Sequence, residues 1–248
     1  MIIAGYGFVG KAYELLFKNH RREIVIHDPP KGIKADLKNT SAVVVCVPTP
    51  PSEDGTCDMS AVYEIVEQCN DFTPILIKST ISLQGWHELK ERFPNHKLCF
   101  SPEFLRAANF MSDVQDMDHV ILSGETDYWR DQYSYNWAHI KINIVSPEEA
   151  ISIKYFRNAF LATKVSFFNE IYDFCKAYGI DFNQVRGGIG SDKRIGDSHT
   201  YVWPEDNVRG WGGLCFPKDT SALLKMAEEK NINLNTLEAA VEYNKKIH

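Results

Sequence analysis

A cysteine late in the sequence lies in a setting that suits nucleophilic chemistry. The stretch GWGGLCFPKD (210–219) places Cys215 between a glycine-rich loop and a proline that favours the first turn of a helix. A helix N-terminus and the nearby Lys218 would stabilise a thiolate, and Asp219 follows within reach of a proton or a water molecule. A lone cysteine is most often a small buried apolar residue, but this pattern favours a candidate nucleophile.

A second glycine-rich loop, near the N-terminus, has the pattern of a dinucleotide-binding turn. GYGFVG (5–10) fits G-x-G-x-x-G, follows a short apolar strand pattern and precedes a helical one. Gly5 would permit the tight turn, Gly7 would let a pyrophosphate approach the backbone, and Gly10 would let helix and strand pack closely. Asp28, 18 residues beyond Gly10, suits a ribose 2′-hydroxyl and favours NAD over NADP. The alternative is a packing loop in which Asp28 is an ordinary turn residue.

Two polar residues stand on an otherwise apolar helical face. Lys154 and Asn158 are four residues apart in IKYFRNAFLATKVSFFNEIY, so they share one side of a helix. A buried lysine or amide must be paired. The two residues therefore either fix the packing of helices or meet a polar ligand, and their spacing leaves both possibilities open.

These candidates need elements that position them, and the first 145 residues predict a sheet. Strand and helix patterns alternate over residues 1–145, which is typical of a doubly wound parallel α/β sheet. SPEE is then a capping box, with Ser146 as N-cap and Glu149 three residues later. A long helical pattern runs to about Tyr178, and only helical patterns follow. We predict a Rossmann-like NAD-binding domain (1–145) and an all-helical domain (146–248) built on a long central helix.

Composition narrows the classes of partner and compartment. The 248 residues carry a net charge of −6 and no long Lys/Arg run, which argues against nucleic-acid binding. The six cysteines form no CxxC pair, so we expect a reducing, cytoplasmic setting without disulfides or a metal site. The longest uncharged run (40–52) is too short for a membrane span, and the strand pattern at Met1 leaves no place for a signal peptide.

Seven short motifs occur in an order that marks a family. They are GYGFVG (5–10), VPTP (47–50), KSTIS (78–82), SPEFLR (101–106), KYFRNAFLATKVSFFNE (154–170), DKRIG (192–196) and GGLCFPKD (212–219). With these motifs the chain resembles the UDP-glucose/GDP-mannose dehydrogenase family, most closely the members that oxidise UDP-glucose. The motifs extend over nearly the whole chain.

The resemblance implies a four-electron oxidation of a sugar nucleotide by two molecules of NAD. A C6 alcohol, as in UDP-glucose, becomes an aldehyde and then an acid, as in UDP-glucuronate. By this resemblance Cys215 adds to the aldehyde, the thiohemiacetal loses hydride, and the thioester is hydrolysed. A nucleophile is needed because a bare aldehyde has no hydride to give until its carbon becomes tetrahedral.

The resemblance also implies roles for individual residues. Lys154, Asn158 and Asp219 match residues that handle the proton, the water and the developing oxyanion. Glu103 and Thr80 match residues for acid–base chemistry and water positioning. The implied cofactor contacts, besides the three glycines, are Phe8, Val9, Asp28, Thr49, Thr80 and Lys218. The implied substrate contacts are Glu103, Leu105, Lys154, Asn158, Arg194, Gly212 and Cys215.

A homodimer is the expected assembly. Arg194 matches an arginine that, in the family, reaches the sugar bound to a neighbouring subunit. The apolar segment AFLATKVSFF (159–168) also suits contact between subunits.

The chain departs from the family pattern in three places, which keeps alternatives open. Pro48 comes only 20 positions after Asp28, Ala107 stands where the family has a glutamate, and we expect the family's C-terminal UDP-binding domain to be absent. Related dehydrogenases of GDP-mannose or UDP-N-acetyl-hexosamine remain possible, as does a catalytically impaired NAD-binding remnant. A one-step β-hydroxyacid dehydrogenase is disfavoured, because its chemistry needs no thiol.

Overall fold

The chain folds into two compact units. The residues described in this computed structural model are 1–18, 23–52, 55–202, 209–213 and 215–248. One unit is formed mainly by Met1–Ser52 and Cys57–Lys154, and the other mainly by Tyr155–His248. The division falls inside one long helix, α6 (Pro147–Tyr178), so the predicted domain boundary at its start stays a prediction.

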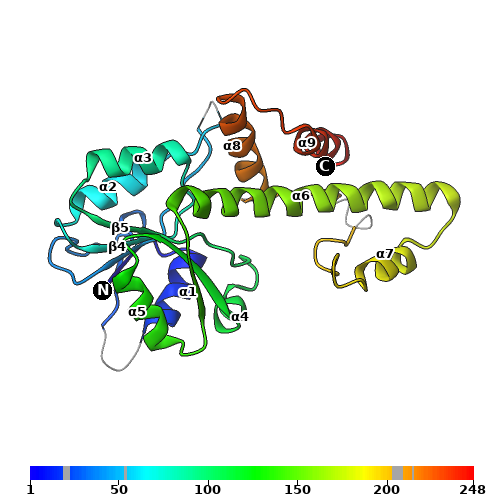
Figure 1. Ribbon diagram of the computed structural model, residues 1–248. Helices are drawn as coiled ribbons and strands as arrows, with labels where there is room; N and C mark the ends of the chain where they lie inside the picture. Colours follow the sequence, from blue (N-terminus) through cyan, green and yellow to red (C-terminus); the bar gives the residue numbers. More distant parts are fainter. Residues whose placement is uncertain (19–22, 53–54, 203–208, 214) are drawn as a thin grey trace. The chain divides into compact units, whose positions relative to one another are not determined.

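The first unit is built on a sheet with helices on both faces. Its seven described strands, in spatial order, are β2 (Val25–His27), β1 (Ile2–Ala4), β3 (Val43–Val45), β4 (Pro74–Ile77), β5 (Lys97–Phe100), β6 (His119–Gly124) and β7 (Lys141–Ile144). The helices are α1 (Phe8–Phe17), α2 (Ser60–Gln68), α3 (Leu83–Arg92), α4 (Phe110–Gln115) and α5 (Asp127–Asn136). Helices α2 and α3 cover one face and α1, α4 and α5 the other (Figure 1). The predicted Rossmann-like fold is confirmed.

The core of this unit explains the unbroken apolar strands of the sequence. Ile3, Val44 and Leu76 lie on three adjacent strands and are fully buried. They belong to one cluster with Phe17 of α1 and Trp129 of α5. Strands that are covered on both faces have no polar side to present to water, so they are apolar at every position.

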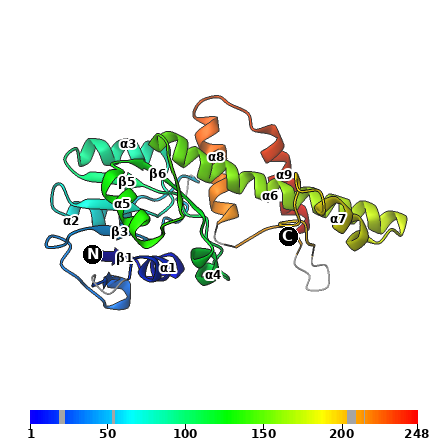
Figure 2. The same ribbon diagram turned by 60° about the horizontal axis from the view of Figure 1, so that its bottom comes forward.

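One pair of strands differs from the all-parallel sheet that the sequence predicts. β6 runs antiparallel to β5, with Phe100 opposite Ser123, whereas all other neighbouring strands are parallel. The helix between them, α4, has six residues and spans about 9 Å, less than the length of β6 at about 20 Å. It packs beside α1 (Figures 1 and 2) and does not carry the chain back along the sheet. The chain therefore enters β6 from the edge at which it left β5.

The described part of the second unit consists of helices and loops. α6 is followed by α7 (Phe182–Gly190), α8 (Phe216–Glu228) and α9 (Asn235–Ile247). Ala162 and Val165 of α6 pack against Trp211, and Phe168 packs with Cys175 and Phe182 in a second small cluster. None of the helices in the described residues has the length and hydrophobicity that crossing a bilayer requires.

The start of α6 is held by the capping box that the sequence predicts. The backbone N–H of Glu149 donates to Ser146 Oγ at 3.2 Å, and the N–H of Ser146 donates to Glu149 Oε2 at 2.7 Å. Each side chain thereby satisfies a backbone donor that has no partner inside the helix. The helix begins at Pro147, where the sequence placed its first residue.

Ser146→Ala should lower the free energy of unfolding by about 1 kcal/mol, because the N–H of Glu149 loses its acceptor. Ser146→Thr keeps a hydroxyl at the same place and should retain most of that stability. Urea denaturation followed by circular dichroism measures both. An equal loss in the two variants would show that the hydroxyl does not act as a cap.

Candidate active site

The N-terminal glycine loop has the geometry of a pyrophosphate site. Gly5 has φ +89°, and a Cβ on it would lie 2.6 Å from the backbone of Cys46. A Cβ on Gly10 would lie 2.1 Å from the carbonyl oxygen of Gly5, whereas a Cβ on Gly7 would meet no atom within 4 Å. Gly7 is also the N-cap of α1 and offers no side chain to the free N–H groups of that helix. Gly5 and Gly10 are thus closely packed, as the tight turn and the helix–strand contact of a dinucleotide site require. Gly7 is open, as the approach of a pyrophosphate requires.

Asp28 follows β2 and is fastened to this loop. Its Oδ2 accepts the backbone N–H of Tyr6 at 2.9 Å and the ammonium of Lys31 at 2.8 Å. The hydrogen bond from Lys31, helped by that from Tyr6, lowers the pKa of Asp28. The acid that would meet the ribose thus lies next to the glycine loop. Lys31, which the sequence analysis did not single out, accompanies it.

Further predicted cofactor residues lie after neighbouring strands. Thr49 follows β3 and Thr80 follows β4, and the thiol of Cys57 lies 4.0 Å from the carbonyl oxygen of Thr49 and 3.3 Å from that of Thr80. Phe8, at the start of α1, packs its ring against Phe110. Because parallel strands end at the same edge, these residues gather where α/β sheets bind ligands. Val9 packs against the core beneath the glycine loop.

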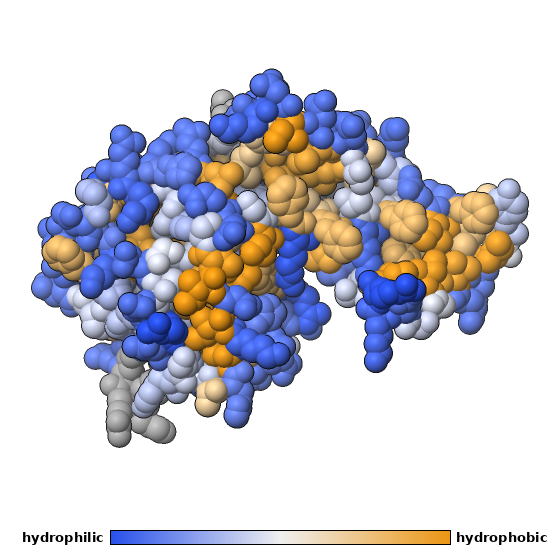
Figure 3. Space-filling model, in the orientation of Figure 1, coloured by the Kyte–Doolittle hydropathy of each residue, from blue (hydrophilic) through white to orange (hydrophobic). Residues whose placement is uncertain are grey.

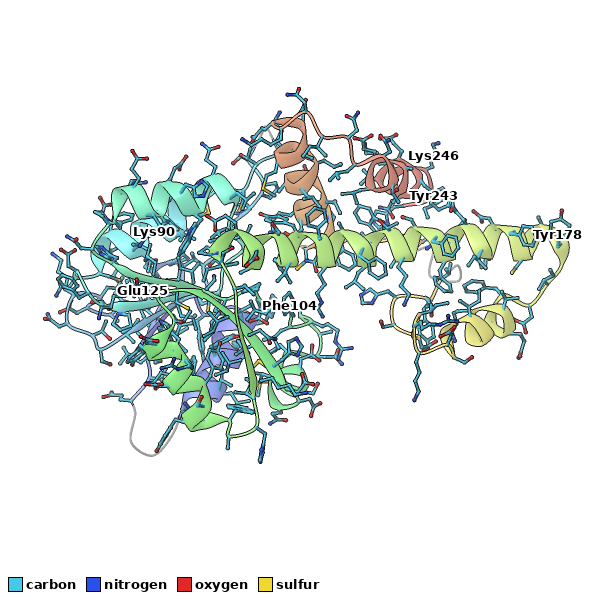
Figure 4. The ribbon with its side chains drawn as sticks, viewed as in Figure 1. Lys90, Phe104, Glu125, Tyr178, Tyr243 and Lys246 are labelled. Carbon is cyan, nitrogen blue, oxygen red and sulfur yellow. The ribbon has the colours of Figure 1, made fainter. Side chains whose placement is uncertain are left out.

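Glu103, after β5, is held from several sides. Its Oε1 accepts the backbone N–H groups of Phe104 at 2.7 Å and Leu105 at 2.8 Å. Lys154 donates to the carbonyl oxygen of Glu103 at 2.6 Å, and its ammonium lies 5.8 Å from the ring of Phe104, which is labelled in Figure 4. Leu105, a predicted substrate contact, thus acts here through its backbone. The buried Lys154 thus has a polar partner in the backbone of Glu103.

Lys78 is a residue of this site that sequence reasoning missed. Its side chain is 1% exposed, and its ammonium lies 3.4 Å from Glu103 Oε2. The same ammonium donates to Ser101 Oγ at 2.9 Å and to the carbonyl oxygen of Pro102 at 3.1 Å. Burial lowers the pKa of Lys78, and the nearby Glu103 opposes that effect. Its position in the sequence could have identified it. A lysine directly after the apolar strand PILI lies at the edge of the sheet where ligands bind.

In the second unit a buried carboxylate ties two helices together. Asp219 of α8 is 1% exposed, and its Oδ2 accepts a hydrogen bond from Asn158 of α6 at 2.5 Å. Its Oδ1 lies 2.5 Å from the ammonium of Lys218. This contact is the helix-packing role predicted for Asn158, and its predicted role toward a polar ligand stays a prediction. Lys218, predicted to contact the cofactor, binds this carboxylate, and its cofactor role stays a prediction.

Cys215 directly precedes α8, as the sequence predicts, and it is an exposed residue. The backbone N–H of Asp219 donates to the carbonyl oxygen of Cys215 at 2.9 Å, so the first turn of α8 links the two residues. Burial raises the pKa of Cys69 and of Cys99 to about 12, which keeps those thiols protonated near neutral pH. Exposure thus distinguishes Cys215 from the buried cysteines.

The loop before Cys215 is pinned to α9. Asn244 accepts the N–H of Trp211 at 2.7 Å and donates to its carbonyl oxygen at 2.9 Å. A Cβ on Gly212 would lie 2.9 Å from the ring of His248, and Gly213 has φ +75°. The path of the chain therefore favours glycine at 213, whereas a Cβ at 212 would displace only the ring of His248. Residues 203–208 and 214 lie outside the described residues.

Arg194 is paired within its own loop. Its guanidinium forms an ion pair with Asp192 at 2.5 Å and is largely exposed. Lys164 of α6 fixes the same loop by donating to the carbonyl oxygens of Ile195 at 2.8 Å and Gly196 at 3.0 Å. The predicted contact of Arg194 with a substrate stays a prediction.

Comparison with known proteins gives consistent matches. Residues 27–135 match the NAD binding domain, and residues 148–246 the central domain, of the UDP-glucose/GDP-mannose dehydrogenase family. UDP-glucose 6-dehydrogenase from Rickettsia bellii is 35% identical over 225 residues, which are 85% of this chain and 50% of that protein. The enzyme of the same name from Pseudomonas aeruginosa is 34% identical over 223 residues, 82% of this chain and 48% of that protein. The chain thus spans about half the length of these relatives.

Solved structures share the fold. A UDP-glucose dehydrogenase from Pyrobaculum islandicum superposes with a TM-score of 0.83 at 24% identity, covering 99% of this chain and 67% of that one. A UDP-D-ManNAc dehydrogenase from Pyrococcus horikoshii gives 0.81 at 18% identity, covering 100% and 69%. The glycine loop precedes the matched NAD binding domain at residue 27, so its assignment rests on sequence and geometry.

Gly10→Ala and Gly7→Ala should separate packing from ligand binding. The methyl group of Gly10→Ala would overlap the backbone of Gly5, and we expect a loss of about 1–3 kcal/mol in the free energy of unfolding. Gly7→Ala meets no neighbour, so it should unfold within about 1 kcal/mol of the unaltered chain but bind NADH about tenfold more weakly. Chemical denaturation and NADH fluorescence titration measure the two effects. Equal destabilisation by both changes would contradict the assignment.

Proposed function

Since the chain belongs to the UDP-glucose/GDP-mannose dehydrogenase family, we propose that it carries out the NAD-dependent oxidation of UDP-glucose to UDP-glucuronate. The observation that carries the proposal is Cys215, an exposed residue held one helical turn from the buried carboxylate of Asp219. NAD, when bound, accepts one hydride in each of the two oxidations. The glycine loop and Asp28 are the groups that would hold its pyrophosphate and adenosine ribose.

In the proposed second oxidation the thiol makes the aldehyde carbon tetrahedral. The thiolate of Cys215 forms a C–S bond, and the carbonyl electrons move to oxygen. When the oxygen electrons re-form C=O, hydride leaves and a thioester remains. Water then adds to the thioester, the C–S bond breaks, and the carboxylic acid and the thiol are released. A thioester is readily hydrolysed, which explains the choice of sulfur over oxygen.

The remaining polar residues are proposed to manage protons and the developing oxyanion. Lys154 and Asn158, four residues apart on α6, are the donors for that oxygen. Asp219 is the group that accepts a proton. Glu103 and Thr80, which follow adjacent strands, are proposed to orient the hydrolytic water. We propose the cytoplasm as the compartment, since six free cysteines suit a reducing environment.

The ratio of NADH formed to sugar consumed tests the reaction. With UDP-glucose we expect two NADH per sugar and UDP-glucuronate by mass spectrometry. GDP-mannose and UDP-N-acetyl-hexosamines belong in the same screen, and faster turnover of either would replace the proposed substrate. One NADH per sugar would indicate a single-step dehydrogenase, and none would indicate an NAD-binding remnant.

Cys215→Ser should stall the second oxidation, because a hydroxyl is a far weaker nucleophile and its ester hydrolyses more slowly. We expect acid formation to fall at least about a hundredfold. Cys69→Ser is the matched control, since the buried Cys69 thiol donates to the carbonyl oxygen of Ile65, which a hydroxyl also does. Acid release at the normal rate by Cys215→Ser would mean that the nucleophile is another residue.

We also propose a homodimer formed through α6. Phe160, Phe167 and Phe174 recur every seven residues along this helix and are 67%, 56% and 59% exposed. Figure 3 shows hydrophobic residues along the surface of the second unit. A seven-residue apolar repeat is the spacing with which two helices pack, and exposed apolar patches of this kind mark protein interfaces.

Phe160→Glu combined with Phe167→Glu should convert the dimer to a monomer, because two carboxylates would be buried at each contact. Light scattering after size-exclusion chromatography at micromolar concentration measures the mass. Tyr135→Glu, at an exposed aromatic residue of α5, is the control and should remain dimeric. A monomeric unaltered chain would refute the dimer.

A further inference from the structure

The turn that follows β2 is locked into one shape. Asp28 and Ile33 exchange two backbone hydrogen bonds, with N···O distances of 2.8 and 3.2 Å. Between them lies a single 3₁₀ turn, η1 (Pro29–Lys31), in which two proline rings restrict φ. Gly32 closes the turn with φ +75° and donates to the carbonyl oxygen of Pro29 at 2.9 Å. The backbone of Lys31 is therefore fixed relative to Asp28.

The side chain of Lys31 lies over the acid and the glycine loop together. Its ammonium donates to Asp28 Oδ2 at 2.8 Å and to the carbonyl oxygen of Tyr6 at 2.6 Å. The side chain of Lys31 is 52% exposed, whereas that of Asp28 is 10% exposed. The positive charge thus stands on the solvent side of the carboxylate. Lys31 is held there by a rigid turn and by two acceptors, unlike an ordinary exposed lysine.

This arrangement alters the usual rule for choosing between dinucleotides. An acid after the second strand binds the ribose 2′-hydroxyl of NAD and repels the 2′-phosphate of NADP. A phosphate monoester carries about two negative charges near neutral pH, and an ammonium is a strong donor to it. We infer that Lys31 sets the dinucleotide selectivity of this chain, by offsetting the charge of Asp28 and offering a donor to a 2′-phosphate.

The same geometry remains compatible with NAD. The N–H of Tyr6 and the ammonium of Lys31 both donate to Oδ2 of Asp28. A ribose hydroxyl would then meet the other carboxylate oxygen, Oδ1. Lys31 therefore narrows the difference between the two dinucleotides without removing the NAD contact. This inference rests on dinucleotide binding by the first unit and not on the proposed oxidation.

The test compares NADH and NADPH affinities by fluorescence titration, which needs no turnover. Lys31→Met should raise the ratio of the NADPH to the NADH dissociation constant about tenfold, mainly through weaker NADPH binding. Asp28→Asn should lower that ratio, because the lysine then faces no carboxylate. Lys34→Met removes an exposed lysine three residues further on and should leave the ratio unchanged within about twofold.

An unchanged ratio in Lys31→Met, or an equal change in Lys34→Met, would overturn the assignment. Thermal unfolding of each variant without ligand shows whether the turn is intact. A selective loss of NADPH affinity in a variant that also melts earlier still supports the role, since misfolding would weaken both dinucleotides. If the unaltered chain bound neither, the inference would fail at its premise. If it bound NADH and oxidised no sugar nucleotide, only the proposed reaction would fail.

Discussion

A buried charge must find its partner inside the protein, and this constraint fixes most of the candidate functional groups. The ammonium of Lys78 is 1% exposed and is surrounded by oxygens of the segment that carries Glu103. The carboxylate of Asp219 is equally buried between Asn158 and Lys218. Removing one partner of such a pair costs about 3–5 kcal/mol, which is comparable to the margin of stability of many domains. Charge pairing therefore determines the conformation around Glu103 and in the first turn of α8 as much as apolar packing does.

The direction of the strands explains why the dinucleotide residues lie together. Asp28, Thr49, Thr80 and Glu103 follow β2, β3, β4 and β5, and these strands are parallel, so their carboxyl ends form one edge. The glycine loop follows β1 at the same edge. The series of parallel strands ends at β6, which is antiparallel to β5. The candidate site residues of the first unit therefore follow β1 to β5, which are adjacent in the sheet. The connection from β2 to β3 is short, and the rigid turn with Lys31 lies at this edge, where we propose that the adenosine binds.

Local patterns could be read from the sequence, whereas distant pairings could not. The turn at the glycine loop and the capped start of α6 depend on neighbouring residues, and the sequence predicts both. Asp219, the partner of Asn158, lies 61 residues away in the sequence, and Ser101, a partner of Lys78, lies 23 residues away. The periodicity of a helix predicts which face a residue lies on but not which distant residue it contacts. The helix α4 was missed because its six residues carry no side-chain cap and little periodicity. The reversal of β6 was missed because apolar patterns do not encode strand direction.

The proposed chemistry places opposite demands on the groups around the thiol. A nucleophile must be reachable by its substrate, and of the six cysteines Cys215 is the one that is exposed, with Cys46 intermediate and the others buried. A proton acceptor, by contrast, must hold one orientation, and Asp219 achieves this by burial between two donors. The first turn of α8 satisfies both demands, because its hydrogen bond from the Asp219 N–H to the Cys215 carbonyl spans the boundary between surface and interior. A helix N-terminus therefore serves here as a rigid spacer between an accessible sulfur and a fixed carboxylate.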